Sequence, residues 1–471
     1  MSALAAVVLG LASGQGGQAA TPPLVLSRQQ ALELGMGASL NLRSQVLTVE
    51  ENQALVGLAR SRFLPKLDLV ALGTFAQVNT DIGFISNLPT IGDLSLNLGA
   101  DGSALINNTF VNLGLILNLP LLDFGRGPLQ QAAKADLQAA RAEQQEQQRR
   151  SRFDILSRYL TAQLSAAQIP VWESSLALSR RLLGDVNAIR REGLAPRIDT
   201  FQAEALVQAD LQGLAEAQAQ HTIALSALAR LLNLPAESRV EAGDPLQPDP
   251  AWSHSLSDSI SQAIERRPAL ESLIQLQQAQ RARVQLARAG RLPSVGLLVG
   301  GGISGNWLGI PSQSTGANVS SGGGTGVGLP TLSTSGEASG SFTDWGAAIT
   351  MRQPLYDGGL TRESIALAQS RAAQAEITVA QAQQAIVQSV ENWFATHQAA
   401  GSQTAAARAA IRAGESSVQD AQLRYRAGLS PLTELLIAQR NLQVARSAQA
   451  SAIYRWNLSR AGLELETGLE P

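Results

Sequence analysis

Two kinds of hydrophobic periodicity follow one another along this chain, and the change between them is abrupt. Apolar residues occupy every second position from 111 to 119, which predicts a β-strand with one apolar face. From Pro128, a run rich in Ala, Gln, Arg and Glu predicts an unbroken helix to about Arg190. The same change recurs after the alternating stretch 345–351, and a still longer helix follows. A strand that leads directly into a very long helix therefore occurs twice.

The whole series of predicted elements occurs twice, which indicates an α+β fold built from a duplicated helix–β-hairpin–long-helix unit. The first repeat, 21–234, comprises helix 27–63, strands 67–78 and 110–122, and helices 128–190 and 198–232. The second repeat, 255–471, comprises helix 259–291, strands 294–304 and 343–356, and helices 360–427 and 432–465. A segment rich in Pro, Asp and Glu, 235–254, is predicted to connect the repeats at mid-length as an exposed equatorial connector.

Matching residues in the repeats show where length is constrained. A capping box, in which Ser is followed three residues later by Gln, is predicted to begin the first helix at Ser27 and its counterpart at Ser259. Between the strands the second repeat gains six residues, whereas the helical arm that follows changes by one. One extra helical residue rotates every later side chain by about 100°, but an extra loop residue costs little. The pattern therefore predicts parallel helices that line a shared tunnel.

The two helical arms are predicted to be very long and to end in similar turns. At 1.5 Å per residue, each would extend about 95–100 Å. The first arm ends at Gly193, with Pro196 three residues later, and the second ends at Gly428, with Pro431 three residues later. Glycine commonly ends a helix and proline commonly begins one. Each arm is therefore predicted to reverse into a returning helix.

The predicted strands have the length and the aromatic residues of membrane-spanning strands. Segments of about nine to twelve residues suffice to cross a bilayer. Aromatic residues at their ends suggest two interfacial girdles against membrane lipid: Phe75, Phe110, Trp307, Phe342 and Trp345 toward the loops, and Phe124 and Tyr356 toward the helices. The alternative is the edge of a soluble β-sandwich. Four strands cannot close a barrel, and an open edge is not tolerated in lipid, so the chain must oligomerise if its strands span a bilayer; three copies would give twelve strands.

Composition excludes some classes of protein and leaves the membrane interpretation intact. The 471 residues are 45% hydrophobic, carry a net charge of −2 and show no basic stripe, so no nucleic-acid partner is predicted. The absence of cysteine excludes disulfides and thiolate chemistry. The apolar start, followed by small residues near Ala19 and Ala20, is similar to a secretory signal peptide spanning 1–20. No basic residue precedes it, and a disordered tail is the alternative.

Two other classes of function, an enzyme and a structural protein, are alternatives to a membrane channel. For an enzyme, the three histidines, His221, His254 and His397, lie in different segments without metal-ligand spacing. The adjacent carboxylates Glu464 and Glu466 would point to different faces of a helix, so no catalytic site, metal or cofactor is predicted. The second alternative is a non-channel structural coiled-coil protein of the cell envelope. It explains the long helices but not the amphipathic strands.

The ordered series of short motifs resembles the TolC family of outer-membrane efflux proteins, from Ser27 to Leu465. Leu64–Pro65 and Leu292–Pro293 end the first helices, whereas 120–125 and 354–359 end the second strands. The turn Tyr425–Gly428, followed by Thr433–Leu435, completes the resemblance. No single motif is specific, but the order is repeated twice.

This resemblance implies a fold, a location and partners. It implies a homotrimer with a twelve-stranded β-barrel in the outer membrane of a Gram-negative-type bacterium and an α-helical tunnel in the periplasm. It also implies docking to a periplasmic membrane-fusion (adaptor) protein and to an inner-membrane transporter of the ABC, RND or MFS type. Such a duct exports small molecules or proteins, type I secretion included. The cargo is not predicted.

The resemblance further implies a gate at the periplasmic tip. Tyr425 stands at the family's constricting tyrosine, Glu434 at an acidic position facing the lumen, and Asp199 where a polar partner is expected; Arg424 is assigned to the same gate. A second acidic position holds Ile437 here. The turns around Gly193, Pro196, Gly428 and Pro431 are the expected adaptor-docking surface. Three converging Glu434 side chains would attract cations, a divalent ion included. The alternative is a solvated charge at a helix N-terminus.

Overall fold

The computed structural model describes residues 24–87, 97–193, 195–235, 238–315, 318–319, 327–328 and 332–469. The predicted signal peptide, 1–20, lies outside the described residues. The chain divides into two compact units that we describe separately. One comprises Met1–Gln53, Ala135–Ala279 and Ala372–Pro471, and the other comprises Ala54–Lys134 and Gln280–Arg371.

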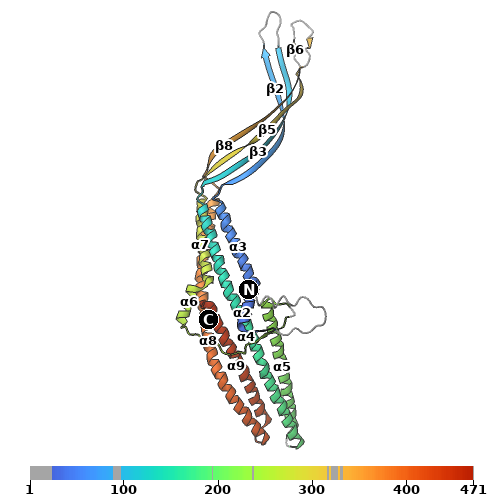
Figure 1. Ribbon diagram of the computed structural model, residues 1–471, viewed down its shortest axis with the longest axis vertical. Helices are drawn as coiled ribbons and strands as arrows, with labels where there is room; N and C mark the ends of the chain where they lie inside the picture. Colours follow the sequence, from blue (N-terminus) through green and yellow to red (C-terminus); the bar gives the residue numbers. More distant parts are fainter. Residues whose placement is uncertain are drawn as a thin grey trace. The chain divides into compact units, whose positions relative to one another are not determined.

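The second unit contains a four-stranded antiparallel sheet in the order β2-β3-β5-β8 (Figure 1). Its strands are β2 (Lys66–Asn87), β3 (Asn97–Leu122), β5 (Ser294–Thr315) and β8 (Leu332–Arg352). Each of them is longer than the strand predicted for it, namely 67–78, 110–122, 294–304 and 343–356. The reason is that backbone pairing continues beyond the stretches in which apolar and polar residues alternate. β8 nevertheless ends at Arg352, before the predicted limit at 356. The short strands β6 (Asn318–Val319) and β7 (Val327–Gly328) form a separate pair.

Each repeat begins with two helices instead of the predicted single helices 27–63 and 259–291. The first repeat has α2 (Arg28–Ala38) and α3 (Leu40–Ser61), and the second has α6 (Leu256–Arg266) and α7 (Pro268–Ala289). The breaks fall at Ser39 and Arg267, both in extended conformation. Pro268 explains the second break, because a residue before proline is disfavoured in the helical region. Helical composition alone did not reveal either break.

The predicted capping box is confirmed in the first repeat and wrong in the second. Ser27 and Gln30 form both reciprocal bonds of the box. In the second repeat Ser255, not Ser259, caps the helix and accepts from the Asp258 N–H. Ser259 lies inside α6, where its hydroxyl donates to Ser255 O. The helix therefore begins one turn earlier than the capping pattern at Ser259 predicts.

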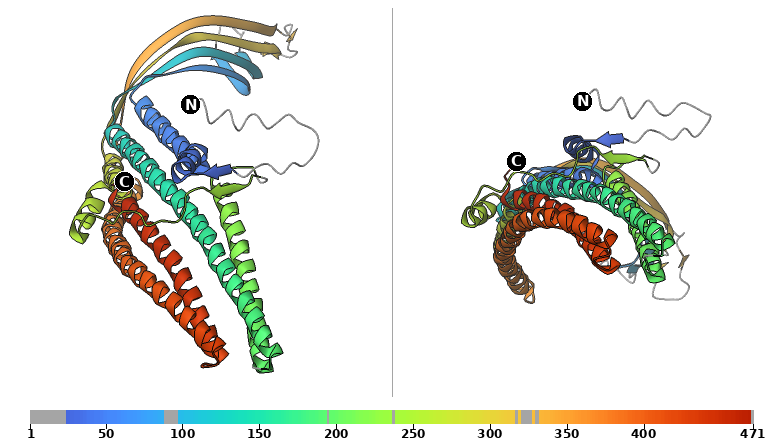
Figure 2. Two further views of the ribbon diagram at one scale, coloured as in Figure 1. Left: turned by 60° about the horizontal axis from the view of Figure 1, so that its bottom comes forward. Right: turned by 90° about the horizontal axis from the view of Figure 1, so that it is seen from below.

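The long helices agree closely with the sequence. They are α4 (Arg126–Arg191), α5 (Arg197–Leu231), α8 (Leu360–Arg426) and α9 (Leu432–Thr467). In both Figure 1 and Figure 2, α4 lies alongside α5 and α8 lies alongside α9, each pair joined by a tight turn at one end. None of the described helices combines the length and the apolarity needed to cross a bilayer.

The connector contains more regular structure than predicted. Its strand β4 (Val240–Ala242) pairs in parallel with β1 (Leu24–Leu26). Leu26 and Val240 are buried in one core with Ile155, Tyr159 and other residues of α2, α4 and α5. The segment 235–254 is therefore partly anchored in the fold and is not an exposed linker throughout.

Few aromatic residues are needed to fill the contacts between the helices. Tryptophan rings pack directly over glycines of neighbouring helices: Trp172 over Gly213, Trp393 over Gly462, and Trp456 over Gly401. A Cβ at any of these glycines would collide with the indole. Small residues thus allow large rings to seal the bundle, which fits a chain with only 4% aromatic residues.

Candidate functional site: helix tip, connector and sheet face

Both turns at the helix tip have the geometry that their Gly and Pro residues predict. Gly193 and Gly428 have φ values of 77° and 70°, in the left-handed region that glycine adopts without steric cost. Pro196 and Pro431 are the N-caps of α5 and α9, each with φ of −71°. The two turns therefore have closely similar backbone angles at their glycine and at their proline.

Tyr425 at the end of α8 is bonded to Asp199 at the start of α5. The Tyr425 hydroxyl donates to Asp199 Oδ2 over 3.0 Å, and the tyrosine is 8% exposed. Burial raises the pKa of Tyr425, and the adjacent Asp199 carboxylate adds to this shift, so the phenol remains a protonated donor at neutral pH. Two residues that the sequence proposed for one gate are thus joined across the repeats.

A second polar link beside it was not anticipated. Arg426 Nη2 lies 2.7 Å from Asp185 Oδ2, which ties α8 to α4. Nothing in the sequence pattern distinguishes this arginine from its neighbours. Arg424, by contrast, pairs with Asp420 one turn earlier on its own helix, and the structure does not bring it to Asp199.

The predicted acidic gate residue has no such partner within one copy. Glu434 is exposed in the first turn of α9, and its backbone N–H bonds to Pro431 O. Among the described residues its side chain forms no ion pair. Ile437, one turn later, is also exposed.

A single apolar core supports the polar links at the tip. It includes Leu182 and Val186 of α4, Ala203 of α5, Val418 and Tyr425 of α8, and Leu432, Leu435 and Leu442 of α9. All four helices contribute to it. The polar links therefore join helices that are already packed together through this core.

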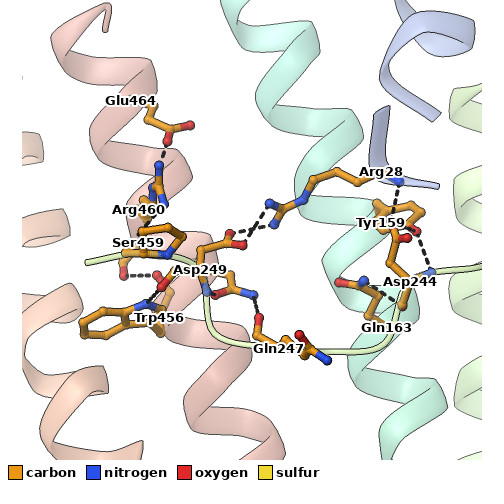
Figure 3. A network of polar contacts seen from close by, with 12 residues as sticks. Arg28, Tyr159, Gln163, Asp244, Gln247, Asp249, Trp456, Ser459, Arg460 and Glu464 are labelled. Atoms are coloured by element: carbon orange, nitrogen blue, oxygen red, sulfur yellow. Dashed lines mark hydrogen bonds and ion pairs between the residues drawn. The ribbon is translucent and has the colours of Figure 1, made fainter. Parts of the chain in front are cut away.

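The connector is held at its first end by a compact polar network (Figure 3). Arg28 forms a paired contact with Asp249, with a shortest distance of 2.7 Å, and its backbone N–H donates to Asp244 Oδ2. The Tyr159 hydroxyl lies within hydrogen-bond distance of Asp244 Oδ2 and of Leu26 O. Burial raises the pKa of Tyr159 to about 12. These bonds join α2, α4 and the connector.

The remainder of the connector is bound mainly through its backbone. Gln163 on α4 donates to Asp244 O over 2.9 Å. On α9, Trp456 Nε1 donates to Asp249 O over 2.7 Å, and Arg460 donates to Pro250 O. Figure 3 shows these side chains converging on the chain between Asp244 and Asp249 from different helices. The connector is thus fixed to both repeats.

His397 on α8 holds the second end of the connector. This histidine is 6% exposed, and its Nε2 accepts the Trp252 backbone N–H over 3.2 Å. Its Nδ1 lies 3.1 Å from the Ser459 hydroxyl, and its ring faces Trp456 with centroids 3.9 Å apart. Burial lowers the pKa of His397, which favours the neutral ring that can accept this bond. Within the described residues, no group of three His, Asp or Glu side chains is placed to hold a metal ion.

The helix break at Arg267 is occupied by a buried ion cluster. Arg267 contacts the carboxylates of Glu146 on α4 and Glu466 on α9. The Glu146 side chain is fully buried and also accepts from Arg150 Nε over 2.9 Å. The cluster anchors the junction of α6 and α7 to two long helices.

Register gives the four-stranded sheet one continuously apolar face. Paired positions on this face carry Leu69 and Leu115, Leu113 and Ile303, and Val299 and Ala347. Leu69, Leu113, Leu115 and Ile303 are largely exposed in a single copy. The opposite face carries Asn112, which donates to the Ser304 hydroxyl over 2.7 Å. The sheet therefore presents an apolar surface and a mixed, more polar one.

Register also corrects part of the aromatic girdle. Phe75 and Trp307 both pair with Thr109 and share the apolar face. Phe110 pairs with Thr74 and Asn306, which places it on the opposite face, because side chains alternate along a strand. Phe110 therefore lies on the face opposite the one that carries Phe75 and Trp307, and the prediction that it shares one girdle with them is wrong.

Three other aromatic residues can also be placed. Trp345, 84% exposed, is on the apolar face opposite Gly301, well inside β8 and not at a loop end as predicted. At the helix-proximal end, Phe124 and Tyr356 follow the strands and are exposed. The apolar band thus has aromatic residues near both ends and one within it.

A long amphipathic sheet whose strands lead into helices of 66 and 67 residues is the architecture expected of a channel-forming membrane protein. Comparison with known proteins identifies the family. The model of the outer membrane efflux protein family matches residues 36–234 and 259–469, and the chain belongs to this family. The two matched segments correspond to the two repeats, with the whole connector, 235–254, between them.

Similar proteins span most of the chain. Nodulation protein T of Rhizobium leguminosarum bv. trifolii is 24% identical and protein CyaE of Bordetella pertussis 26% identical; each match covers 93% of this chain, and 84% and 83% of the relatives. Among solved structures, VceC of Vibrio cholerae has a TM-score of 0.72 at 18% identity, covering 94% of this chain and 96% of that one. The MtrE channel of Neisseria gonorrhoeae has a TM-score of 0.69 at 20% identity, with 94% and 88% covered.

Family and fold together locate the protein and set its broad role. It is an outer-membrane efflux channel, with the strands forming the barrel part and the long helices the periplasmic tunnel. The family is a family of channels and not a class of enzyme. The prediction of a TolC-family protein is confirmed.

Proposed function

We propose that three copies of this chain form one duct through the outer membrane and the periplasm, with a gate at the helix tip. The observation that carries the trimer is the pair of free sheet edges. β2 and β8 each have one neighbour in the four-stranded sheet, and both extend past 20 residues. Unpaired backbone groups are costly in lipid, so β8 of one copy would pair with β2 of the next. Three copies supply the twelve strands of a closed barrel.

Apolar residues on the long helices support association of the same kind. Leu47 on α3 and Ile377 on α8 are more than half exposed, as are Leu58 and Leu367 on the same two helices. Exposed leucines along helices of this length would be covered by helices of neighbouring copies. The structural coiled-coil alternative shares this feature, but it leaves the apolar sheet face without a role.

The proposed gate is the set of helix ends held by the bond between Tyr425 and Asp199. This bond and the ion pair between Arg426 and Asp185 hold α8 against α4 and α5. Loss of these links would let the ends of α8 and α9 separate from the first repeat. Glu434, exposed beside them, is the residue for which the sequence suggested a cation-attracting ring. That cation site remains a prediction.

The proposed partners are a periplasmic adaptor and an inner-membrane transporter. The two turns at Gly193 and Gly428 present similar backbone shapes at one end of the tip helices, which supports docking of a repeated adaptor element there. Substrate selection would then lie in the transporter, because a passive duct does not choose its cargo.

Native mass and conductance of the purified protein test the proposal. Protein extracted from outer membranes in mild detergent should have the mass of a trimer and form channels in planar bilayers. A monomer or dimer without channel activity would refute the duct and favour the structural coiled-coil protein.

A further inference from the structure

The two turns at the tip are equivalent positions of the two repeats, and they lie 235 residues apart in the sequence. This offset takes Gly193 to Gly428, and the backbone bonds agree with it. The Gly193 N–H donates to Arg190 O, and the Gly428 N–H donates to Tyr425 O. Arg190 of the first repeat therefore occupies the position that Tyr425 occupies in the second.

The returning helices follow the same offset. The Asp199 N–H donates to Pro196 O at the start of α5, and the Glu434 N–H donates to Pro431 O at the start of α9. Both prolines are N-caps with nearly identical backbone angles. Glu434 therefore matches Asp199.

Two polar links at the tip join the second repeat to the first within one copy. When both residues of a link are replaced by their equivalents in the other repeat, 235 positions away, each link becomes a pair of oppositely charged residues. The bond from Tyr425 to Asp199 corresponds to Arg190 and Glu434. The ion pair of Arg426 with Asp185 corresponds to Arg191 and Asp420. Neither corresponding pair is in contact within one copy, where Arg190 Nη1 lies 3.4 Å from Thr200 Oγ1, and all four of these side chains are exposed.

In a ring of three copies, first and second repeats alternate, so the boundary between copies resembles the boundary within a copy. We propose that Arg190 of one copy pairs with Glu434 of the next, and that Arg191 pairs in the same way with Asp420. The inference rests on the proposed trimer. It assigns a partner to Glu434 and closes the ring of tip contacts by ion pairs at the boundaries between copies.

Side-chain chemistry fits these positions. Arginine is about as long as tyrosine and ends in donors, as the Tyr425 hydroxyl does, whereas Glu434 offers the same acceptor group as Asp199 with one more methylene. Asp420 already accepts from Arg424 over 2.9 Å, and a carboxylate has room for a second guanidinium. With Arg190 in place, the Glu434 carboxylates are neutralised in pairs, so this pairing and the cation-attracting ring predicted from the sequence are alternatives.

Disulfide crosslinking can test the pairing without interference from native thiols, because the chain has no cysteine. The full-length double variant Arg190→Cys/Glu434→Cys is oxidised in isolated outer membranes and examined on a non-reducing gel. Covalent dimers and trimers that disappear on reduction are expected. The matched control, Asp199→Cys/Tyr425→Cys, should crosslink within one copy and migrate as a monomer. Each single-cysteine variant should give no ladder.

Charge reversal supplies a second readout that does not depend on cysteines. Arg190→Glu should raise the resting single-channel conductance several-fold, and Glu434→Arg in the same chain should restore it. A native trimer that forms no covalent species through 190 and 434, or a double reversal as conductive as Arg190→Glu alone, would refute the pairing while leaving the duct intact. Absence of any trimer in the native mass would refute the duct itself and the pairing with it.

Discussion

Gln163 on α4 and His397 on α8 hold the middle and the second end of one connector, and only one of these two side chains can change its charge. Gln163 donates to Asp244 O over 2.9 Å, whereas His397 accepts the Trp252 N–H over 3.2 Å. An amide keeps its donor and acceptor at every pH. An imidazole that gains a proton at Nε2 can no longer accept. The second end of the connector is therefore bound by a titratable group.

Acidification is expected to release this second end. Because burial lowers the pKa of His397 below its ordinary value of 6.5, the bond to Trp252 is fully present above pH 6.5 and is lost as the pH falls through the lowered value. Arg460 on α9, which also donates to Pro250 O, disfavours the charged ring too. The Trp456 carbonyl oxygen, 3.3 Å from Nδ1, and the stacked Trp456 ring both favour the charged form and so oppose the lowering of the pKa, but neither restores an acceptor at Nε2.

The other titratable groups near this end are His254, whose ring packs against Trp252, and Asp249, which is paired with Arg28. A nitroxide on Ala251→Cys should be immobile at pH 7.5 and mobile, reversibly, at pH 5. With His397→Gln it should be immobile at both pH values, and with His397→Phe mobile at both. His254→Gln is the control and should behave as the parent. A parent spectrum that does not change with pH would contradict the prediction.

Removing the hydroxyl of Tyr425 should loosen the tip. A hydrogen bond to a charged partner contributes about 1.5–3 kcal/mol, so Tyr425→Phe should weaken the closed state by about this amount. The expected result is a higher resting conductance in bilayers with an unchanged trimer mass. Tyr356→Phe is the control, because that side chain is 91% exposed and far along the chain from the tip. Equal conductance of the two variants would argue against a gating role.

The left-handed glycine of the second turn should be needed for docking more than for folding. Gly428→Ala forces a β-carbon into the left-handed region at a cost of about 1–2 kcal/mol, although no neighbouring atom would collide with it. Export should fall while membrane insertion and trimer mass persist. Gly184→Ala on the neighbouring helix α4, where the conformation is helical and the space is open, is the control. Normal export by Gly428→Ala would count against adaptor docking at this turn.

Contacts of tryptophan with glycine should be sensitive to a single added methyl group. Gly213→Ala would place a Cβ against the Trp172 ring and should destabilise the helical unit by about 1–3 kcal/mol through overpacking. Gly184→Ala serves again as control, with a change of opposite sign and up to about 1 kcal/mol. Thermal unfolding followed by circular dichroism measures both. Equal melting temperatures would show that the contact is more compliant than its geometry indicates.

The sequence by itself determined the duplicated order of elements. Alternation of period two located the four strands, and the runs of Ala, Gln and Leu located the helices of 66 and 67 residues to within two residues at each end. Gly193 and Gly428 marked the turns because few other residues adopt a positive φ. These features are local, so local patterns suffice to predict them.

Only the tertiary structure decided which face each side chain occupies and which distant groups meet. Phe110 and Phe75 look equivalent along the sequence, but strand register places them on opposite faces. Ser259 carries the capping pattern, yet Ser255 is the cap, and its hydroxyl accepts from the Asp258 N–H. The bonds from Tyr425 to Asp199 and from His397 to Trp252 join residues 226 and 145 positions apart. Such pairings depend on how helices pack, and no local pattern records that.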